Sequence, residues 1–409
     1  MSRRRGPSSR FGAAELAQSE VVVARRPFWL LALLIGSATI GMHIFVPALP
    51  LLIEEFRIDP ARAQLTISLY MFVIAGGQLV YGPLSDRFGR RPVLLGALAL
   101  FTVAGIAAML AKSFEFLLLA RMAQAAGGCA GLVLGRAVVH DTAKGPDAAR
   151  TIAAVNAVLL ISPTLAPVVG VWIANAFGWR SIPLLLAIFG VITMLGVRFS
   201  LTETAASRFT PPREIFARYL KLFRTRPFLL QVLGGSLSTT PMFVLLTATP
   251  FIAMERLDRS LNDSMMFYAV FVLGLMLGNI QSGRVLRWLG YERTFMTATT
   301  VGLTGALILL VAVLGDVLTV PVFLVAGFLY NLMAGTQAPL TLTRAVEHSQ
   351  ELRGSGTGIF GASQFMFGAV AVSLAGLGRD ITVSSAVMLV FCAGSALLLY
   401  IGMWFAQRR

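Results

Sequence analysis

Residues Gly82 to Arg91 read Gly-Pro-Leu-Ser-Asp-Arg-Phe-Gly-Arg-Arg, and long apolar runs lie on both sides of them. A stretch with four charges does not lie among lipid chains, because its polar groups would find no partners there. Gly82 and Gly89 permit close helix approach and a sharp reversal of the chain. The three arginines are typical of the cytoplasmic side of a membrane. The stretch therefore predicts a tight turn at the inner membrane surface, with Asp86 among cations and helix ends.

The composition is that of a membrane protein with many spans. The chain has 409 residues, of which 56% are hydrophobic and 13% charged, whereas soluble proteins carry about 25% charged residues. The net charge is +15, but the cations fall in short clusters, without the basic stripe of a nucleic-acid-binding protein. Cys129 and Cys392 lie in apolar runs, so we expect no disulfide and no metal site. Because no ATP-binding loop is present, we expect no cofactor and no direct use of ATP.

Twelve apolar runs are long enough to cross a bilayer, which takes about 20 residues each. The expected spans are 27–50, 63–82, 92–111, 116–138, 152–174, 183–200, 227–251, 265–283, 294–314, 320–343, 355–376 and 383–406. Most of the 34 Lys and Arg then fall on one side, which predicts that both chain ends are cytoplasmic. The predicted protein is all-α, with a tail (1–26), a six-helix bundle (27–200), a central loop (201–226), a second six-helix bundle (227–406) and a short tail (407–409).

The central loop contains a predicted amphipathic helix. Thr210-Pro211-Pro212 is a helix-start signal. Apolar side chains then recur at helical spacing between cations: Ile215, Phe216, Tyr219, Leu220 and Phe223, with Arg213, Arg218, Lys221 and Arg224 between them. We expect this helix to lie along the inner membrane surface. The alternative is a docking site for a protein partner.

The two halves contain a sequence repeat, and their turns predict a gate. Gly283 and Gly290 repeat the spacing of Gly82 and Gly89, as expected for two parallel repeats of six spans. In the second copy Arg287 stands where Asp86 stands in the first, so the second turn lacks the acid. Charged side chains at the inner ends of the first-half spans are expected to pair and to hold one conformation closed. The predicted gate consists of Gly82, Asp86, Arg87, Gly89, Arg90, Arg91, Arg136 and Asp141.

Two ionisable side chains, His43 and Arg121, lie inside predicted spans, where a charge is costly. His43 is either a proton or substrate site, since unperturbed His titrates near pH ~6.5, or a buried residue with its hydrogen bonds satisfied. Arg121 either extends toward the external surface or faces a cavity and binds substrate. Neutral side chains that line a cavity or join helices complete the predicted substrate and proton pathway: Gln124, Asn156, Gln231, Asn331 and Gln364.

Three motifs carry a resemblance to transporters of the major facilitator superfamily. The stretch from Gly82 matches the signature loop between spans 2 and 3, Gly-x-Leu-x-Asp-Arg-x-Gly-Arg-Arg/Lys, at every defined position. Arg121-Met-Ala-Gln resembles the span-4 motif Arg-x-x-Gln-Gly-x-Gly, with Gln124 aligned. The run Ile-Ser-Pro-Thr-Leu-Ala-Pro-Val-Val-Gly resembles the span-5 motif of antiporters through Pro163, Pro167 and Gly170. The two prolines also predict kinks.

The drug-resistance branch of the Bcr/CflA type is the part of the superfamily that this chain resembles. That branch often has Asp-Met-Tyr-Leu-Pro-Ala-Leu-Pro in span 1, and His43 occupies the position of its Asp. The resemblance implies a monomeric secondary transporter in a bacterial inner membrane. It implies that two bundles rock about a midplane cavity and export drugs against proton influx. Because His43 and Arg121 lie inside the spans without an acid, we expect neutral or anionic substrates.

Other functions remain open at this level. A specific exporter or facilitator of metabolites, such as nucleosides, amino-acid derivatives or sugars, would use the same mechanism with a narrower pocket. A membrane enzyme or sensor is a more distant alternative. An enzyme needs a catalytic cluster of side chains, which the sequence does not offer, and a sensor needs a soluble output domain. We therefore predict that the protein is not an enzyme and binds small molecules, protons and lipid, but no nucleic acid.

Overall fold

Long α-helices make up the described part of the chain, which contains no β-strand. The computed structural model describes residues 28–142, 162–163, 165–204, 211–349 and 352–407. Ten of the described helical segments are long and apolar enough to cross a membrane. A bilayer favours helices because every backbone polar group is then paired within its own segment.

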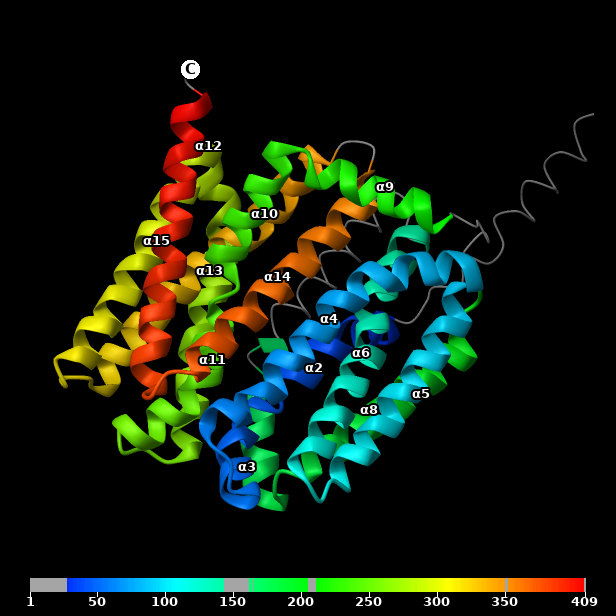
Figure 1. Cartoon of the computed structure of the whole chain (residues 1–409), viewed down its shortest axis with the longest axis horizontal. Helices are drawn as coiled ribbons and strands as arrows, with labels where there is room; N and C mark the ends of the chain where they lie inside the picture. Colours follow the sequence, from blue (N-terminus) through cyan, green and yellow to red (C-terminus); the bar gives the residue numbers. More distant parts are fainter. Residues whose placement is uncertain (1–27, 143–161, 164, 205–210, 350–351, 408–409) are drawn as a thin grey trace, which may run out of the picture.

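In the first half of the chain, α6 (Phe114–Thr142) packs against α2 (Phe28–His43), α4 (Pro60–Phe88) and α5 (Arg90–Met109). Helix α8 (Ser181–Ser200) packs on the other side of α5. Between α2 and α4 lie the 3-10 turn η1 (Val46–Ala48) and α3 (Leu49–Phe56). A shorter apolar helix, Leu165–Phe177, precedes α8. Figure 1 shows these helices as one group, drawn in blue to green.

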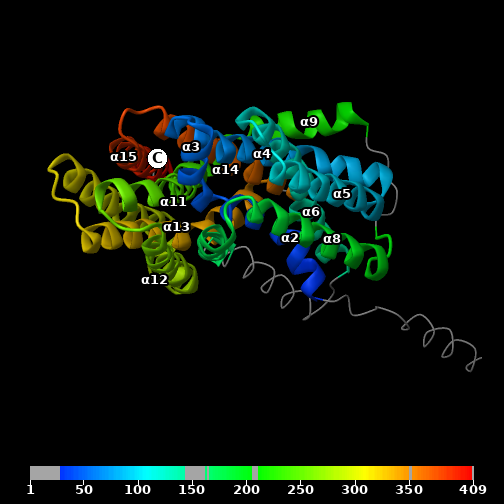
Figure 2. The same cartoon turned by 90° about the horizontal axis from the view of Figure 1, so that it is seen from below.

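In the second half, α12 (Ser264–Leu314) packs along α13 (Val320–His348) and α15 (Ile381–Gln407). Helix α10 (Arg226–Thr239) contacts α13, α14 (Arg353–Gly376) and α15. The remaining elements are α9 (Pro212–Phe223), α11 (Met242–Phe251), the π turn η2 (Ile252–Arg256) and the 3-10 turn η3 (Leu261–Asp263). Figure 2 shows the second-half helices α11, α12, α13 and α15 to one side of the first-half helices α5, α6 and α8.

Two details account for the difference between the ten membrane-spanning segments described and the twelve spans predicted. Helix α12 is interrupted at Gly290, whose φ of 74° and ψ of 173° are not helical, and it therefore makes two crossings. The helix Leu165–Phe177 supplies the end of predicted span 5. Gly89, which separates α4 from α5, has a similar backbone with φ 89° and ψ 150°. The two glycines that the sequence repeat pairs thus break their halves in the same conformation, one that favours glycine.

Several predicted boundaries are wrong. The chain from Gly82 to Phe88 is still helical, so the reversal occurs at Gly89 alone. A Cβ on Gly82 would have no atom within 4 Å, so close helix approach does not explain that glycine. Helix α2, which forms the first part of predicted span 1, ends at His43. The span then continues through η1 and α3 to Phe56. Predicted span 7 is divided between α10 and α11 and runs on to Arg256. Prolines near these breaks, Pro47 and Pro241, lack the N–H that a continuous helix needs.

The two halves meet along α4 and α14, which lie side by side in Figure 1. Gln64 lies against Gly376 at one end of this contact and Gln78 against Gly361 at the other, so the helices run in opposite directions. A Cβ on Gly361 would lie 2.0 Å from Oε1 of Gln78. Because small residues let helices approach closely, glycine on α14 leaves room for the long amide side chains of α4.

Candidate functional site

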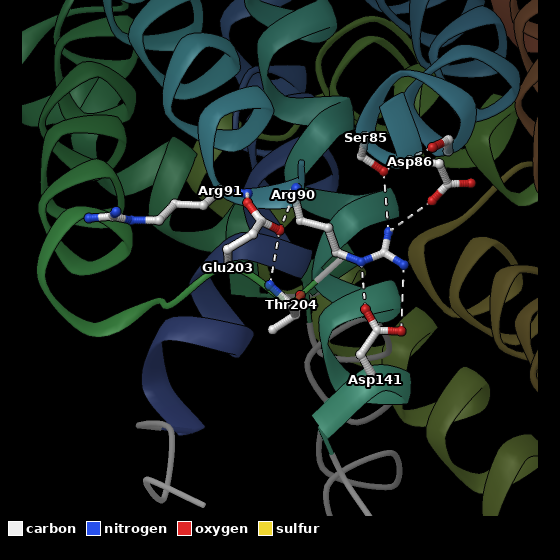
Figure 3. Close-up of polar contacts among 8 residues, drawn as sticks. Ser85, Asp86, Arg90, Arg91, Asp141, Glu203 and Thr204 are labelled. Atoms are coloured by element: carbon white, nitrogen blue, oxygen red, sulfur yellow. Dashed lines mark hydrogen bonds and ion pairs between the residues drawn. The ribbon is translucent and has the colours of Figure 1, made fainter. Parts of the chain in front are cut away.

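Arg90 is the centre of a charged cluster at the α4–α5 turn, shown in Figure 3. Its Nε donates to Oδ2 of Asp141 at 2.5 Å, and its Nη1 donates to Oγ of Ser85 at 3.2 Å. Oδ1 of Asp86 lies 3.8 Å from Nη1. The Arg90 side chain is only 14% exposed, so these contacts are less screened than those of a surface pair. The cluster joins α4, α5 and the end of α6.

Glu203, which follows α8, binds the start of α5 and is drawn below Arg90 and Arg91 in Figure 3. Its carboxylate accepts the backbone N–H of Arg90 at 2.9 Å and that of Arg91 at 3.1 Å. An acid at a helix N-terminus satisfies free N–H groups and interacts favourably with the helix dipole. A Cβ on Gly89 would lie 2.6 Å from Glu203 Oε2. The signature glycine therefore provides both the positive φ of the turn and the space for this carboxylate.

The other predicted gate residues lie outside this cluster. Nη2 of Arg91 donates to the carbonyl oxygen of Arg198 at 2.6 Å, and the guanidinium of Arg87 lies 4.9 Å from the ring centre of Phe88. Arg136 is half-buried on α6 and forms no ion pair with any residue that the structure describes. The structure thus brings Asp86, Arg90 and Asp141 together, but not Arg136.

A cavity of about 1010 Å³ adjoins the Arg90 cluster and lies between the two halves. Its walls come from α4, α5 and α6 on one side and from the region of α13 and α14 on the other, with α9 across them. Gln78, Asp86, Arg90, Arg136 and Asp141 are among its lining residues. Alternating access requires such a space between two bundles that move relative to each other.

Arg121 is fully enclosed, with 1% of its surface exposed. Its Nη1 donates to Oε1 of Gln124 at 2.6 Å, and its Nη2 donates to the carbonyl oxygen of Gly41 at 2.9 Å. The rings of Phe45 and Tyr70 lie 4.2 and 4.3 Å from the guanidinium carbon. Among the described residues no carboxylate lies within ion-pair distance of this cation. Of the two alternatives for Arg121, extension to the external surface is therefore wrong, because its polar atoms find partners inside the protein.

His43 ends α2 and faces the second half of the chain. Its Nδ1 lies 2.7 Å from the carbonyl oxygen of Thr39, and its ring centre lies 5.7 Å from that of Phe243 on α11. Phe243 in turn stacks on Phe365 of α14 at 6.1 Å. The His43 side chain is 2% exposed, and its Nε2 forms no hydrogen bond with any residue that the structure describes. Gly41, which accepts from Arg121, is two residues away.

Comparison with known proteins gives these features a family. A sequence model described as "Major Facilitator Superfamily" matches residues 31–373, which is most of the chain. The protein belongs to the major facilitator superfamily. It is thus a multi-pass membrane transporter rather than an enzyme.

Relatives of this transporter include drug-resistance proteins. A chloramphenicol resistance protein of Pseudomonas aeruginosa is 26% identical over 83% of this chain and 79% of its own length. A bicyclomycin resistance protein homolog of Haemophilus influenzae is 21% identical over 88% of this chain and 90% of its own. Among solved structures, the D-xylose-proton symporter has a TM-score of 0.70 at 15% identity, covering 90% of this chain and 96% of its own. The last similarity shows the fold alone.

The remaining predicted pathway residues are scattered through the transporter. Nε2 of Gln364 donates to Oγ1 of Thr239 at 2.9 Å and joins α14 to α10. The side-chain amide of Asn331 donates to the carbonyl of Gly327, four residues earlier on the same helix, at 2.9 Å. Gln231 is 1% exposed, and its Nε2 has no hydrogen-bond partner in the described part of the chain. Asn156 lies outside the described residues. Among the pathway residues that the structure describes, only Gln124 bonds to Arg121.

The span-5 motif lies next to His43. Pro163 and Pro167 are buried, as is Gly170. A Cβ on Gly170 would lie 2.2 Å from the carbonyl oxygen of Ile44, the residue after His43. The motif therefore holds span 5 close to the point where span 1 breaks.

Sequence reasoning missed Glu203, Tyr70 and Phe243. Glu203 offers no signal beyond being an acid after a span, and the two aromatic residues resemble ordinary core residues of apolar helices. Only the tertiary packing brings them to Arg90, Arg121 and His43.

Proposed function

We propose that this transporter exports neutral or anionic small molecules, chloramphenicol-like drugs among them, in exchange for protons. The geometry of His43 carries the proposal. A carbonyl oxygen only accepts hydrogen bonds, so Nδ1 facing Thr39 carries the ring hydrogen. In the neutral ring, Nε2 then has a free lone pair, and no described residue binds it in this conformation. His43 is therefore a proton acceptor at the boundary between the two halves.

The preference for neutral or anionic substrates follows from the charge of the interior. Arg121 is a cation with only 1% of its surface exposed, and no described carboxylate pairs with it. A lipophilic cation that enters near His43 is repelled by that charge, and more so when His43 is protonated. The names of the relatives, which include resistance to chloramphenicol and bicyclomycin, agree with a drug as the substrate.

We further propose the direction and the moving parts. The arginines of the α4–α5 turn put this turn and both chain ends in the cytoplasm. The bundles 27–200 and 227–406 then rock about the α4–α14 contact, and the cavity beside Arg90 is the cytoplasmic path for substrate. The ion pair between Arg90 and Asp141 keeps the inner ends of α5 and α6 together during this motion. We propose that a monomer is sufficient.

Drug accumulation in cells tests this proposal. Wild type, His43→Ala and His348→Ala are expressed in a bacterial strain without its own efflux pumps. His348, the last residue of α13, serves as the matched histidine control. We expect lower chloramphenicol accumulation with wild type and His348→Ala but not with His43→Ala. Export of cationic dyes without chloramphenicol export would contradict the proposal, and export of metabolites alone would favour the metabolite exporter.

A further inference from the structure

Helix α9 has two apolar faces, of which one is used by the protein itself. The Tyr219 hydroxyl donates to the carbonyl oxygen of Leu79 on α4 at 3.0 Å. Leu222 is 2% exposed and packs with Phe228 and Val232 of α10. Ile215 and Tyr219 line the cavity beside Arg90. This inner face fixes α9 across the end of the bundle, as Figure 1 shows.

The second face is not covered by any residue that the structure describes. Phe216, Leu220 and Phe223 recur at helical spacing and are 68%, 39% and 47% exposed. Exposed cations accompany them at Arg213, Lys221 and Arg224. Glu214, the single acid of α9, already pairs with Arg218 at 2.6 Å. We call this second face, formed by these three apolar residues and three cations, the basic stripe.

The position of α9 places the basic stripe at the membrane boundary. Only Arg224 and Thr225 separate α9 from the membrane-spanning α10, which begins at Arg226. The bond to Leu79 holds the middle of α9 against α4, within a membrane-spanning segment. The exposed rings therefore lie at the depth where lipid headgroups meet acyl chains, which a protein partner from the aqueous phase does not reach easily.

We propose that the basic stripe binds anionic phospholipid. The apolar side chains enter the headgroup–acyl boundary, and the three cations bind the phosphate groups, as in interfacial helices that prefer anionic membranes. Since the opposite face of α9 lines the cavity, anionic lipid holds that wall of the cavity in place. This inference depends on neither the substrate nor proton coupling.

A fluorescent label on the stripe tests the inference. Phe216→Cys is labelled with an environment-sensitive dye; the native Cys129 and Cys392 are 0% and 5% exposed, so the introduced thiol reacts first. The full chain is placed in phosphatidylcholine vesicles with increasing phosphatidylglycerol. We expect the emission to rise and shift to the blue with the anionic lipid. Replacing Arg213, Lys221 and Arg224 by Gln raises the half-maximal phosphatidylglycerol content, with on the order of five-fold lost in lipid affinity per cation.

A matched triple variant controls for net charge. Arg284, Arg287 and Arg293 are exposed cations around the other turn, at Gly290, and their replacement by Gln removes the same charge. We expect the label on α9 to respond as in the protein with these arginines intact. Equal emission in neutral and anionic vesicles, or equal effects of the two triple variants, would overturn the inference. A label that stays accessible to aqueous iodide in anionic vesicles would also overturn it and would favour a protein partner.

Discussion

A Cβ on Gly170 would lie 2.2 Å from the carbonyl oxygen of Ile44, so span 5 touches span 1 at the residue that follows His43. Neither backbone moves away easily, because Ile44 is 2% exposed and its neighbours Phe45 and Val46 are buried as well. Gly96 on α5 offers a contrast: a Cβ there would have no atom within 4 Å.

We expect Gly170→Ala to destabilise the folded protein by about 1–3 kcal/mol, the usual cost of overpacking, and to reduce transport. Gly96→Ala should be neutral or slightly stabilising, because Ala favours helix over Gly. Thermal unfolding of both variants in detergent measures the difference. Equal melting temperatures for the two variants would show that the close approach to Ile44 is not rigid.

The ion pair between Arg90 and Asp141 provides a second prediction. Its atoms lie 2.5 Å apart, and the side chains are 14% and 25% exposed. Asp141→Asn and Arg90→Gln should each reduce transport, and the double variant should lose less than the sum of the two. A double-mutant cycle on unfolding should give a coupling of roughly 1–2 kcal/mol, within the range for residues in contact. Strictly additive effects of the two substitutions on transport would show that the ion pair plays no part in the conformational change.

Arg121 and Tyr70 make a matched pair of substitutions. Arg121→Lys keeps the charge but loses the planar fork that bonds Gly41 and Gln124 together. A hydrogen bond to a charged group is worth about 1.5–3 kcal/mol, so we expect lower stability and severely reduced transport. Tyr70→Phe should be tolerated, because its hydroxyl bonds to no described residue and its ring remains against the guanidinium. Unfolding and chloramphenicol uptake into inverted vesicles measure both variants. Wild-type transport by Arg121→Lys would contradict a role for the fork geometry.

Asp380, between α14 and α15, predicts a pH dependence. Burial opposes its ionisation, but hydrogen bonds from Arg256 and from the N–H groups of Val383 and Thr382 hold the pKa of this carboxyl below its usual range. A lowered pKa contributes stability above the unfolded value of about 3.9 and loses it as the pH falls through the folded value.

Asp380→Asn should therefore be less stable than wild type at neutral pH, by up to about 1 kcal/mol for this partly exposed pair. The difference should shrink below pH ~4 as wild-type Asp380 is protonated. Melting temperatures across pH check this, with Asp316→Asn as a control because that carboxylate is 90% exposed and lies farther from Arg256, at 3.4 Å. A difference that persists unchanged in acid would show that the carboxylate charge is not its cause.

The sequence predicts the spans and the repeat because each is a local property. Apolar runs of sufficient length become helices in lipid, and Gly89 and Gly290, paired by spacing, both have positive φ. The predicted helix of the central loop is also confirmed as α9. Sequence signals of this kind do not depend on tertiary packing.

The candidate site is only partly predictable because its contacts join distant residues. His43 and Arg121 are recognisable as ionisable groups in apolar runs, but the carbonyl of Gly41 and the ring of Phe243 leave no trace in the sequence. The fit of Gln78 against Gly361 depends on how α4 and α14 align. The chain does not turn at Gly82 as the sequence predicts, since the polar residues that follow continue the helix to Phe88.

Proton movement in proteoliposomes tests whether His43 couples drug export to proton influx. Wild type and His43→Ala are reconstituted with a pH-sensitive dye inside, and chloramphenicol is added across an imposed pH gradient. We expect drug-driven proton flux in wild type. We also expect that His43→Ala still carries drug down its own gradient but moves no protons. Chloramphenicol transport without proton flux in wild type, or an unchanged proton flux in His43→Ala, would contradict this coupling.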